Sequence, residues 1–315
     1  MRREKLIFDG EQTIVADNIN GYLIDAPNIA VERRNYPLCA IPIMMKGSIP
    51  VDGGNLIIEL KDYDDFISQE PRAQKFIRQY VGAEEFLNGK DRYCLWLVDA
   101  TKEEIQSMPL VAKRVEAVRQ FRLSSKKAAT RKDAAIPHLF QEIRQPSTDY
   151  IVVPLVSSER RKYIPMDFMT PDVIVSDAVS IIPRAQLYHF AILESSVHMI
   201  WTGVVCGRLE SRYRYSGQIV YNNFPWMKLT IEQCFRLTAQ AQLILDVRGD
   251  YEEMTLAEMY NPESMPEDLR AVHEENDRFV RALYGFDDAM TDLEIITALL
   301  EMYQRLADHS TAPRA

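Results

Sequence analysis

The stretch GRLESRYRYSGQIVYNNFPWMKLTIEQCFRLTAQAQLIL, residues 207–245, contains a change of pattern from which we infer the fold class. Up to Trp226 it is rich in arginine and aromatic residues and has no helical period. From Thr230 onward apolar residues recur every three or four positions, which is typical of one face of a helix. These are Ile231, Cys234, Leu237, Ala241, Ile244 and Leu245. We therefore expect an α+β protein, with a mixed α/β domain followed by a small all-helical C-terminal domain.

Three regions follow from this reading of the chain. Residues 1–50 combine short apolar runs with several prolines and resemble the trailing edge of a preceding domain, or a linker. Residues 51–229 hold apolar runs that predict buried strands, a helical spacing over 71–82 that ends at Gly82, and a Thr101–Glu104 capping box. Residues 230–315 predict helices over 230–248, 255–260, 266–284 and 291–306.

Charge is distributed unevenly along the 315 residues. The chain has a net charge of −9, but residues 246–315 hold 17 acidic and 6 basic residues, a balance of −11, which leaves +2 for residues 1–245. Within residues 110–132, eight basic residues stand against Glu116 alone. Such a stretch suggests a nucleic-acid-binding surface. A solvated helix face is the alternative, and further basic groups at 160–162 and 208–214 weaken it.

Cysteine usage and hydropathy limit where the protein works. The four cysteines are far apart and lack CxxC spacing, which favours reduced thiols in the cytoplasm over a zinc site. The N-terminal residues lead into a short apolar run, so we expect no signal peptide. No run of about 18 apolar residues is present, so we expect no membrane span.

Three motifs resemble catalytic sites. Asn223-Phe224-Pro225-Trp226 has the ends of an amino-methyltransferase loop, but Phe224 replaces the first proline and no GxG cofactor loop occurs in the chain. A turn that closes the domain with packed aromatic residues is the better interpretation. Asp52 with Glu59 and Lys61 imitates a nuclease metal-binding string, yet Asp52 lies in a glycine turn. Ser195-Ser196 near His198 lacks a nucleophile elbow, and His198 is more typical of a buried core histidine.

Glu210-Ser211-Arg212 is a candidate for reading DNA bases. On one strand, residues two apart face the same way, which would place Glu210 and Arg212 side by side. In the major groove, glutamate accepts a hydrogen bond from cytosine N4, and arginine donates two to guanine O6 and N7. One C·G pair offers both partners. A surface ion pair is the alternative.

Phosphates of the same duplex would be contacted by a second set of residues. These are Arg119, Arg122, Lys126, Lys127, Arg160, Arg161 and Arg214.

Several longer strings are similar to one family. VSSERRKYIP, YHFAILESSVHMIWTGVVCGRLESRYRYS, IVYNNFPW, LAEMYNPESMPEDLRAVHEENDRFVRALYGF and DGGNLIIE with DRYCLWL resemble the C-terminal third of MmeI-like type IIL restriction–modification enzymes and related adenine-specific DNA methyltransferases. The resemblance covers nearly the whole chain. It implies a domain edge over 1–50, a DNA target-recognition domain over 51–229 and a C-terminal helical domain over 230–315. It also matches Glu210 and Arg212 to the family's base-reading pair, which varies between Glu/Arg and Lys/Asp.

The resemblance implies a recognition module with no catalytic residues of its own. We expect this chain to bind double-stranded DNA, to be inactive alone and to hold no cofactor. S-adenosylmethionine would belong to the parent N6-adenine methyltransferase, and Mg²⁺ to a parent that also cleaves DNA. The methyltransferase domain would act in cis or in trans. Two alternatives remain: a specificity subunit that works with a separate methyltransferase, and a self-sufficient DNA-modifying enzyme.

Overall fold

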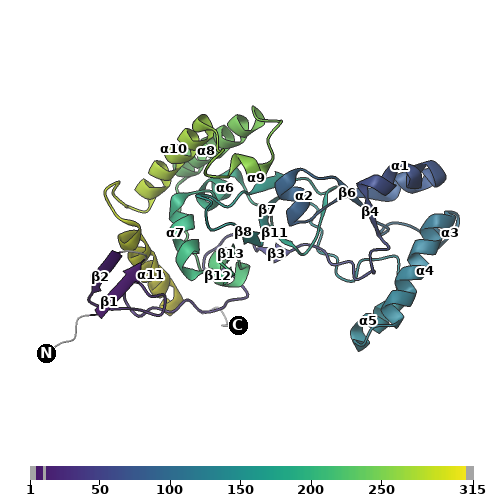
Figure 1. The fold of residues 1–315 in the computed structure, drawn as a ribbon, viewed down its shortest axis with the longest axis horizontal. Coiled ribbons are helices and arrows are strands. Elements are labelled where there is room, and N and C mark those ends of the chain that lie inside the picture. The colour runs from purple at the N-terminus through teal and green to yellow at the C-terminus, as the bar shows by residue number, and fades with distance from the viewer. Residues whose placement is uncertain (1–4, 10–11, 310–315) are drawn as a thin grey trace. The chain divides into compact units, whose positions relative to one another are not determined.

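The computed structural model describes residues 5–9 and 12–309, and these fold into two compact units (Figure 1). Among the described residues, the first unit takes the chain up to Met44, residues 155–166 and everything from Ala185 onward. The second unit takes Met45–Pro154 and Asp167–Arg184. Each unit is therefore built from separate stretches of the sequence. The boundaries expected at residues 50 and 229 stay a prediction.

The second unit contains two four-stranded sheets. In one, the strand order is β10 (Ile174–Val175), β5 (Ile77–Val81), β6 (Arg92–Leu95) and β4 (Ile57–Glu59), and only the β10–β5 pair is parallel. In the other, the order is β3 (Met45–Lys46), β11 (Val179–Pro183), β7 (Tyr150–Pro154) and β9 (Asp167–Met169), with antiparallel pairing throughout. Every residue of β7 is buried, as its continuous apolar run predicts.

Five helices of the described residues belong to this unit. They are α1 (Leu60–Gln69), α2 (Ala83–Asn88), α3 (Lys102–Gln106), α4 (Pro109–Leu123) and α5 (Ala128–Lys132), with short 3₁₀ turns at Pro71–Phe76 and Asp133–Ala135. Of these, α1, α3 and α4 share an apolar core with the first of the two sheets. Val111 and Val118 of α4 join Ile58 and Phe66 in one buried core cluster. The Thr101–Glu104 capping box is confirmed at the start of α3.

The helix predicted over 71–82 is wrong in its second half. Residues 77–81 form strand β5, because Ile77 pairs with Leu95 and Gln79 with Tyr93 of β6. Tyr80 is buried and packs edge-on against Phe140. Pairing with a neighbouring strand has therefore overridden a local helical spacing.

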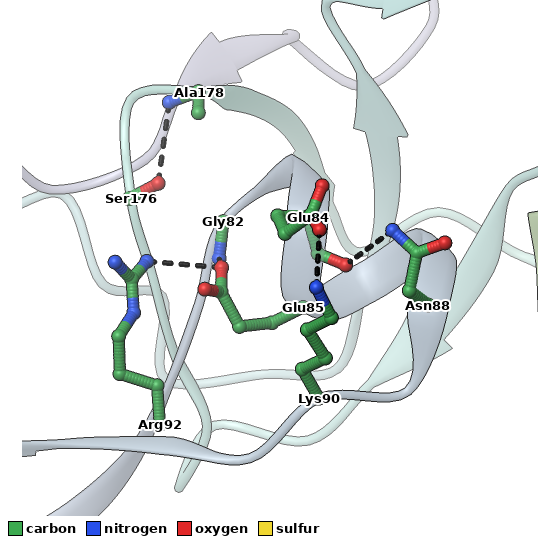
Figure 2. Close-up of polar contacts among 8 residues, drawn as sticks. All are labelled: Gly82, Glu84, Glu85, Asn88, Lys90, Arg92, Ser176 and Ala178. Atoms are coloured by element: carbon green, nitrogen blue, oxygen red, sulfur yellow. Dashed lines mark hydrogen bonds and ion pairs between the residues drawn. The ribbon is translucent and has the colours of Figure 1, made fainter. Parts of the chain in front are cut away.

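A compact polar cluster joins β5, α2 and β6 (Figure 2). The Glu85 carboxylate accepts hydrogen bonds from the Gly82 backbone N–H at 2.8 Å and from the Arg92 guanidinium at 2.9 Å. A Cβ on Gly82 would lie 2.8 Å from Glu85 Oε2 and 3.0 Å from Ser176 Oγ, so a larger residue does not fit without a shift. Gly82 therefore lets the carboxylate approach the backbone and cap α2.

The first unit combines small sheets with most of the helices. Hairpin β1 (Lys5–Asp9) and β2 (Gln12–Ala16) forms one sheet, and β12 (Gly207–Leu209), β13 (Arg212–Arg214) and β8 (Val156–Ser157) form another in that order. Its helices are α6 (Leu187–Leu193), α7 (Ser196–Val205), α8 (Ile231–Gly249), α9 (Leu256–Met259), α10 (Glu267–Leu283) and α11 (Asp292–His309). A π-helical turn spans Gly217–Tyr221.

The four helices predicted after Thr230 are confirmed, with boundaries close to those expected. Thr230 and Thr255 cap α8 and α9 through hydrogen bonds with the third helical residue, and Thr291 bonds Glu294 in the same way before α11. The predicted α+β class is confirmed as well. Within the described residues, no helix combines the length and the apolar character needed to cross a bilayer.

Candidate nucleic-acid interface

Glu210 and Ser211 form the two-residue turn of the β12–β13 hairpin. Leu209 pairs with Arg212 and Gly207 with Arg214, so the turn is tight. Glu210 adopts a φ of 58°, in the left-handed region that non-glycine residues rarely occupy. The interpretation of Glu210 and Arg212 as neighbours on one strand is therefore wrong. The turn, rather than the strand period, brings them to the same place.

Glu210 and Arg212 nevertheless form an ion pair at the hairpin tip. Glu210 Oε2 lies 2.8 Å from Arg212 Nη2. The two side chains are 77% and 46% exposed, so water solvates both charges. An exposed pair of this kind stabilises a fold by only about 0–1 kcal/mol. The pair uses one carboxylate oxygen of Glu210 and one guanidinium nitrogen of Arg212. The second carboxylate oxygen and the other guanidinium nitrogens are not used by this pair.

Other residues hold the turn from outside the pair. The Arg208 guanidinium donates to the carbonyl oxygens of Ser211 at 3.3 Å and Gly203 at 2.8 Å. Its Cζ also lies 4.1 Å from the centre of the Tyr213 ring. The Glu159 carboxylate hydrogen-bonds the side chain of Ser211. The hairpin tip is thus attached to α7 and to the segment after β8.

Three of the predicted phosphate contacts lie in the same unit as this hairpin. Arg214 is exposed on β13, which pairs with β8. Arg161 is half-buried near β8, where its Nη1 lies 3.4 Å from Ser157 Oγ, and burial lowers its pKa from the usual value. Arg160 is exposed and forms an ion pair with Glu263. Their role at phosphates stays a prediction.

The remaining predicted phosphate contacts belong to the second unit. Lys126 and Lys127 are exposed between α4 and α5. Arg119 is exposed on α4, where both its Nε and Nη2 bond the Glu116 carboxylate at 2.9 and 3.0 Å. This pairing reduces the positive field that Arg119 can offer a phosphate. Lys126 and Lys127 are the stronger candidates of the three.

The prediction for Arg122 is wrong. Its side chain is fully buried, and its guanidinium donates to five backbone carbonyl oxygens at 2.7–3.1 Å. No donor is left for a phosphate. The acceptors belong to Pro50, Val51, Asp133, Ile136 and Leu139, so Arg122 joins three separate chain segments. A basic residue within a charged stretch has here become a structural residue of the core.

Asn223-Phe224-Pro225-Trp226 is a buried turn. The Asn223 side-chain amide donates to the carbonyl oxygens of Glu32, Gln218 and Ile219, all within 3.0 Å. Phe224 is fully buried against the rings of His198, Trp201, Trp226 and Tyr284. Trp226, the aromatic end of the motif, is itself buried against the rings of Tyr221 and Phe224 and cannot stack on a flipped base. The interpretation as a turn with packed aromatic residues is confirmed.

The two remaining catalytic motifs have structural roles. Ser195 caps α7 by accepting from the His198 backbone N–H, and the buried His198 Nε2 lies 3.1 Å from the Tyr215 hydroxyl. Burial lowers the pKa of His198 to about 3. The Asp52 carboxylate accepts from the backbone N–H groups of Gly54 and Leu56 at 3.1 and 2.6 Å, which fixes the glycine turn.

The sequence patterns did not identify a buried polar link inside the first unit. Asp277 of α10 accepts from the Tyr163 hydroxyl at 2.7 Å and from the Ser196 backbone N–H at 2.6 Å. Burial raises the pKa of this carboxyl. The link ties the N-terminus of α7 to α10. Its signal was present, since His273, Asn276 and Asp277 are polar residues on the inner face of an amphipathic helix.

Comparison with known proteins places these features in a family. The sequence matches the family model described as "MmeI, target recognition domain" over residues 25–228, which is more than half of the chain. The chain belongs to this MmeI family. A second model, "MmeI, C-terminal domain", matches residues 232–310. The resemblance drawn from the sequence strings is thereby confirmed.

Two relatives of the MmeI family are longer than this chain. "DNA methyltransferase A" of Bacillus subtilis (strain 168) is 37% identical over 304 residues, which make up 96% of this chain and 34% of that protein. The solved structure of the type IIL restriction–modification enzyme MmeI in complex with DNA superimposes with a TM-score of 0.93 at 40% identity. That match covers 97% of this chain and 42% of the MmeI chain. The chain thus spans less than half the length of either relative.

Proposed function

We propose that this chain is the sequence-reading part of an N6-adenine DNA methyltransferase or type IIL restriction–modification enzyme, and that the β12–β13 hairpin enters the major groove. One observation carries this proposal: an acceptor-only side chain and a bidentate donor stand 2.8 Å apart on an exposed hairpin tip. A two-stranded ribbon fits the major groove, and a C·G pair presents there one amino donor and two acceptors. The similar MmeI enzyme was solved in complex with DNA.

The ion pair itself prepares the two groups for this role. In the free protein, Glu210 Oε2 and Arg212 Nη2 satisfy each other. The second carboxylate oxygen remains for cytosine N4, and the other guanidinium nitrogens remain for guanine O6 and N7. Because the pair is exposed, partial separation costs at most about 1 kcal/mol. A good bidentate base contact contributes about 1–3 kcal/mol of discrimination, which exceeds that cost.

Phosphate contacts would add affinity without adding base specificity. Arg214 and Arg161 lie near the hairpin, and Lys126 and Lys127 provide a second exposed basic group. Each phosphate neutralised by such a residue adds to the salt dependence of binding. Acidic residues of the C-terminal region already pair with two basic residues of the 160–162 group, Glu263 with Arg160 and Glu274 with Lys162, and these pairs would weaken the phosphate contacts of that group. Lys126 and Lys127 have no such partner among the ion pairs of the described residues.

We propose that methyl transfer is performed by a separate methyltransferase domain, in cis or in trans. The motif that most resembles a catalytic loop does not fit the chemistry, since Asn223 is committed to backbone carbonyl oxygens and the aromatic end of the motif, Trp226, is buried. S-adenosylmethionine, and Mg²⁺ where cleavage occurs, would be bound by that other part. Calorimetric titration of this chain with S-adenosylmethionine should give no saturable heat, and micromolar binding would contradict the proposal. We place the whole assembly in the cytoplasm.

The β1–β2 hairpin is a candidate surface for that domain. Leu6 and Phe8 on β1 and Val15 on β2 lie on one face of the hairpin, and Phe8 and Val15 are 73% and 63% exposed. Isolated two-stranded hairpins are only marginally stable in water. Phe8→Ser with Val15→Ser should leave the unfolding of this chain unchanged. The same changes should lower methylation when made in a polypeptide that also contains the methyltransferase domain.

Selection from random DNA tests the reading function directly. The chain is incubated with a pool of duplexes of random sequence, bound duplexes are recovered over several rounds, and the product is sequenced. We expect a motif that contains a required C·G pair. Glu210→Ala with Arg212→Ala should relax that position alone, because these side chains specify and the phosphate contacts position. Recovery of duplexes with no shared motif would refute sequence reading by this chain.

A further inference from the structure

We propose that Arg208 is a positioning residue that holds the Glu210–Ser211 turn in the conformation in which Glu210 and Arg212 read a base pair. The assignment rests on the proposed function for its role on DNA, but its structural part stands on contacts within the free protein. Arg208 belongs to a group of arginines in which phosphate binding is the simplest expectation. Its contacts point to a different role.

The two hydrogen bonds and the ring contact of the Arg208 guanidinium are made with the chain that frames the turn, and its charge also acts on the Glu159 carboxylate, which bonds Ser211. Nη1 donates to the Ser211 carbonyl oxygen, inside the turn, and Nη2 donates to the Gly203 carbonyl oxygen near the end of α7. Its Cζ lies over the Tyr213 ring on the paired strand. One side chain therefore connects the turn, its partner strand and a buried helix. Lysine could not reproduce this arrangement, because it has one ammonium group and no planar fork.

The turn needs such an attachment. Glu210 has a φ of 58°. For a non-glycine residue, the population of this left-handed conformation is about five- to thirtyfold lower than that of the right-handed one. Two-residue hairpin turns normally place glycine, asparagine or aspartate at such positions. The exposed ion pair with Arg212 shifts a conformational equilibrium by at most about fivefold. The ion pair alone thus offsets at most the lower end of this range.

The helix to which Arg208 is bonded, α7, is itself held in place by other contacts. α7 is mostly buried, and its first residue, Ser196, is fixed to Asp277 of α10 through a backbone hydrogen bond of 2.6 Å. Asp277 also accepts from the Tyr163 hydroxyl. A series of contacts therefore runs from α10 through α7 to Arg208 and the turn. Strain at the Glu210 position is maintained by this surrounding structure.

The first experiment measures amide hydrogen exchange of the free protein, without DNA. Peptides that span residues 207–214 are compared in the wild-type chain, Arg208→Lys and Arg208→Ala. Loss of two hydrogen bonds from a charged donor should accelerate exchange in this segment by about tenfold or more in both variants. Arg236→Lys is the matched control, because Arg236 also lies 4.1 Å from a ring, that of Phe279, on helices away from the hairpin. Exchange over 207–214 that is unchanged in Arg208→Lys would overturn the proposal.

The second experiment uses the random-duplex selection on the same variants. Arg208→Lys should lose preference at the C·G position, while its affinity for mixed-sequence duplex and its salt dependence stay at the wild-type values. If Arg208 were instead a phosphate contact, Arg208→Lys would keep the motif, and Arg208→Ala would reduce the slope of log affinity against log salt by about 0.9. That result would overturn the assignment. If the wild-type chain selects no motif, the proposed function fails, and hydrogen exchange still decides the structural role of Arg208.

Discussion

His198 Nε2 lies 3.1 Å from the hydroxyl oxygen of Tyr215, with both side chains buried in the first unit. This contact joins α7 to the residue that follows β13. Burial lowers the pKa of His198 to about 3, and it acts in the same way on His273, to about 3, and on His189, to about 4. The folded protein therefore keeps three histidines neutral at pH values where the unfolded chain would protonate them.

Acid should destabilise the protein from about pH 6.5 downward. A folded pKa below the unfolded value of about 6.5 means that protons bind the unfolded chain first, at about 1.4 kcal/mol per pH unit for each group. The loss continues down to pH 4 for His189 and pH 3 for His198 and His273. Asp277, whose pKa is raised by burial, opposes this trend as one group against three.

Urea unfolding at pH 7 and pH 5 measures this effect. We expect the free energy of unfolding to fall by about 3–5 kcal/mol between the two values. NMR titration provides the check for each ring, since the resonances of His189, His198 and His273 should not shift between pH 7.5 and 5.5. A ring of His198 that titrates near pH 6.5 would show that its environment is not the buried one described.

Arg122 should behave as a core residue and not as a DNA contact. Lysine has three donors for the five carbonyl oxygens that Arg122 satisfies. Arg122→Lys should therefore lower the free energy of unfolding by about 3 kcal/mol or more, because each hydrogen bond to a charged group contributes about 1.5–3 kcal/mol. Chemical denaturation measures the loss. Wild-type stability combined with a reduced salt slope for DNA binding would restore Arg122 as a phosphate contact.

Lys126 and Lys127 should show the opposite behaviour. Both side chains are exposed, so Lys126→Ala with Lys127→Ala should leave the unfolding transition almost unchanged. If both contact phosphates, the slope of log affinity against log salt on mixed-sequence duplex should fall by about 1.8. Lys90→Ala is the control, because Lys90 is an exposed lysine already paired with Glu84 at 2.5 Å. If Lys90→Ala lowered the salt slope by as much per lysine, the change would reflect the net charge of the protein and not phosphate contacts of Lys126 and Lys127.

Two glutamates of α2 offer a matched comparison of buried and exposed ion pairs (Figure 2). The Glu85–Arg92 pair is mostly buried, with side chains 10% and 25% exposed, and Glu85 also caps the helix. Glu84 pairs with Lys90 in solvent. Glu85→Gln should lower stability by about 1–3 kcal/mol, whereas Glu84→Gln should change it by less than about 0.5 kcal/mol. Thermal unfolding distinguishes the two, and equal losses would contradict the cluster's structural role.

Local signals in the sequence predicted the helical part of the fold well. The threonine caps before α8 and α9 and the apolar spacing that follows them depend on neighbours within a few residues, and those signals are legible in a single chain. The family assignment was predicted from long strings and is confirmed by the match over residues 25–228. The sequence also correctly predicted His198 and Phe224 as buried structural residues.

Features that depend on distant residues were not predictable. Residues 77–81 have a helical spacing but form a strand, since β6 and β10 pair with them. Arg122 lies in a basic stretch, and its burial depends on carbonyl oxygens about 70 residues away in sequence, at Pro50 and Val51. The turn at Glu210-Ser211 contains none of the glycine or asparagine residues that normally mark a two-residue hairpin. All three features are produced by tertiary contacts, and no pattern among neighbouring residues in the sequence indicates them.

We expect Glu210 and Arg212 at the hairpin tip to specify one base pair. Glu210→Lys alone should place a cation against the cytosine amino group and lower affinity for the preferred duplex by about 1–3 kcal/mol or more. Glu210→Lys with Arg212→Asp should restore binding to a site in which the pair is inverted, with guanine where cytosine stood. Affinity for mixed-sequence DNA should hardly change in either variant, because phosphate contacts dominate it.

The most direct measurement is to map methylated sites by sequencing. The double variant is introduced into a full-length polypeptide that contains this chain and a methyltransferase domain, and the methylated adenines of the host DNA are located. We expect a recognition sequence that is altered at one position only, from C·G to G·C. An unchanged recognition sequence would contradict this expectation, and would leave Glu210 and Arg212 as a surface ion pair.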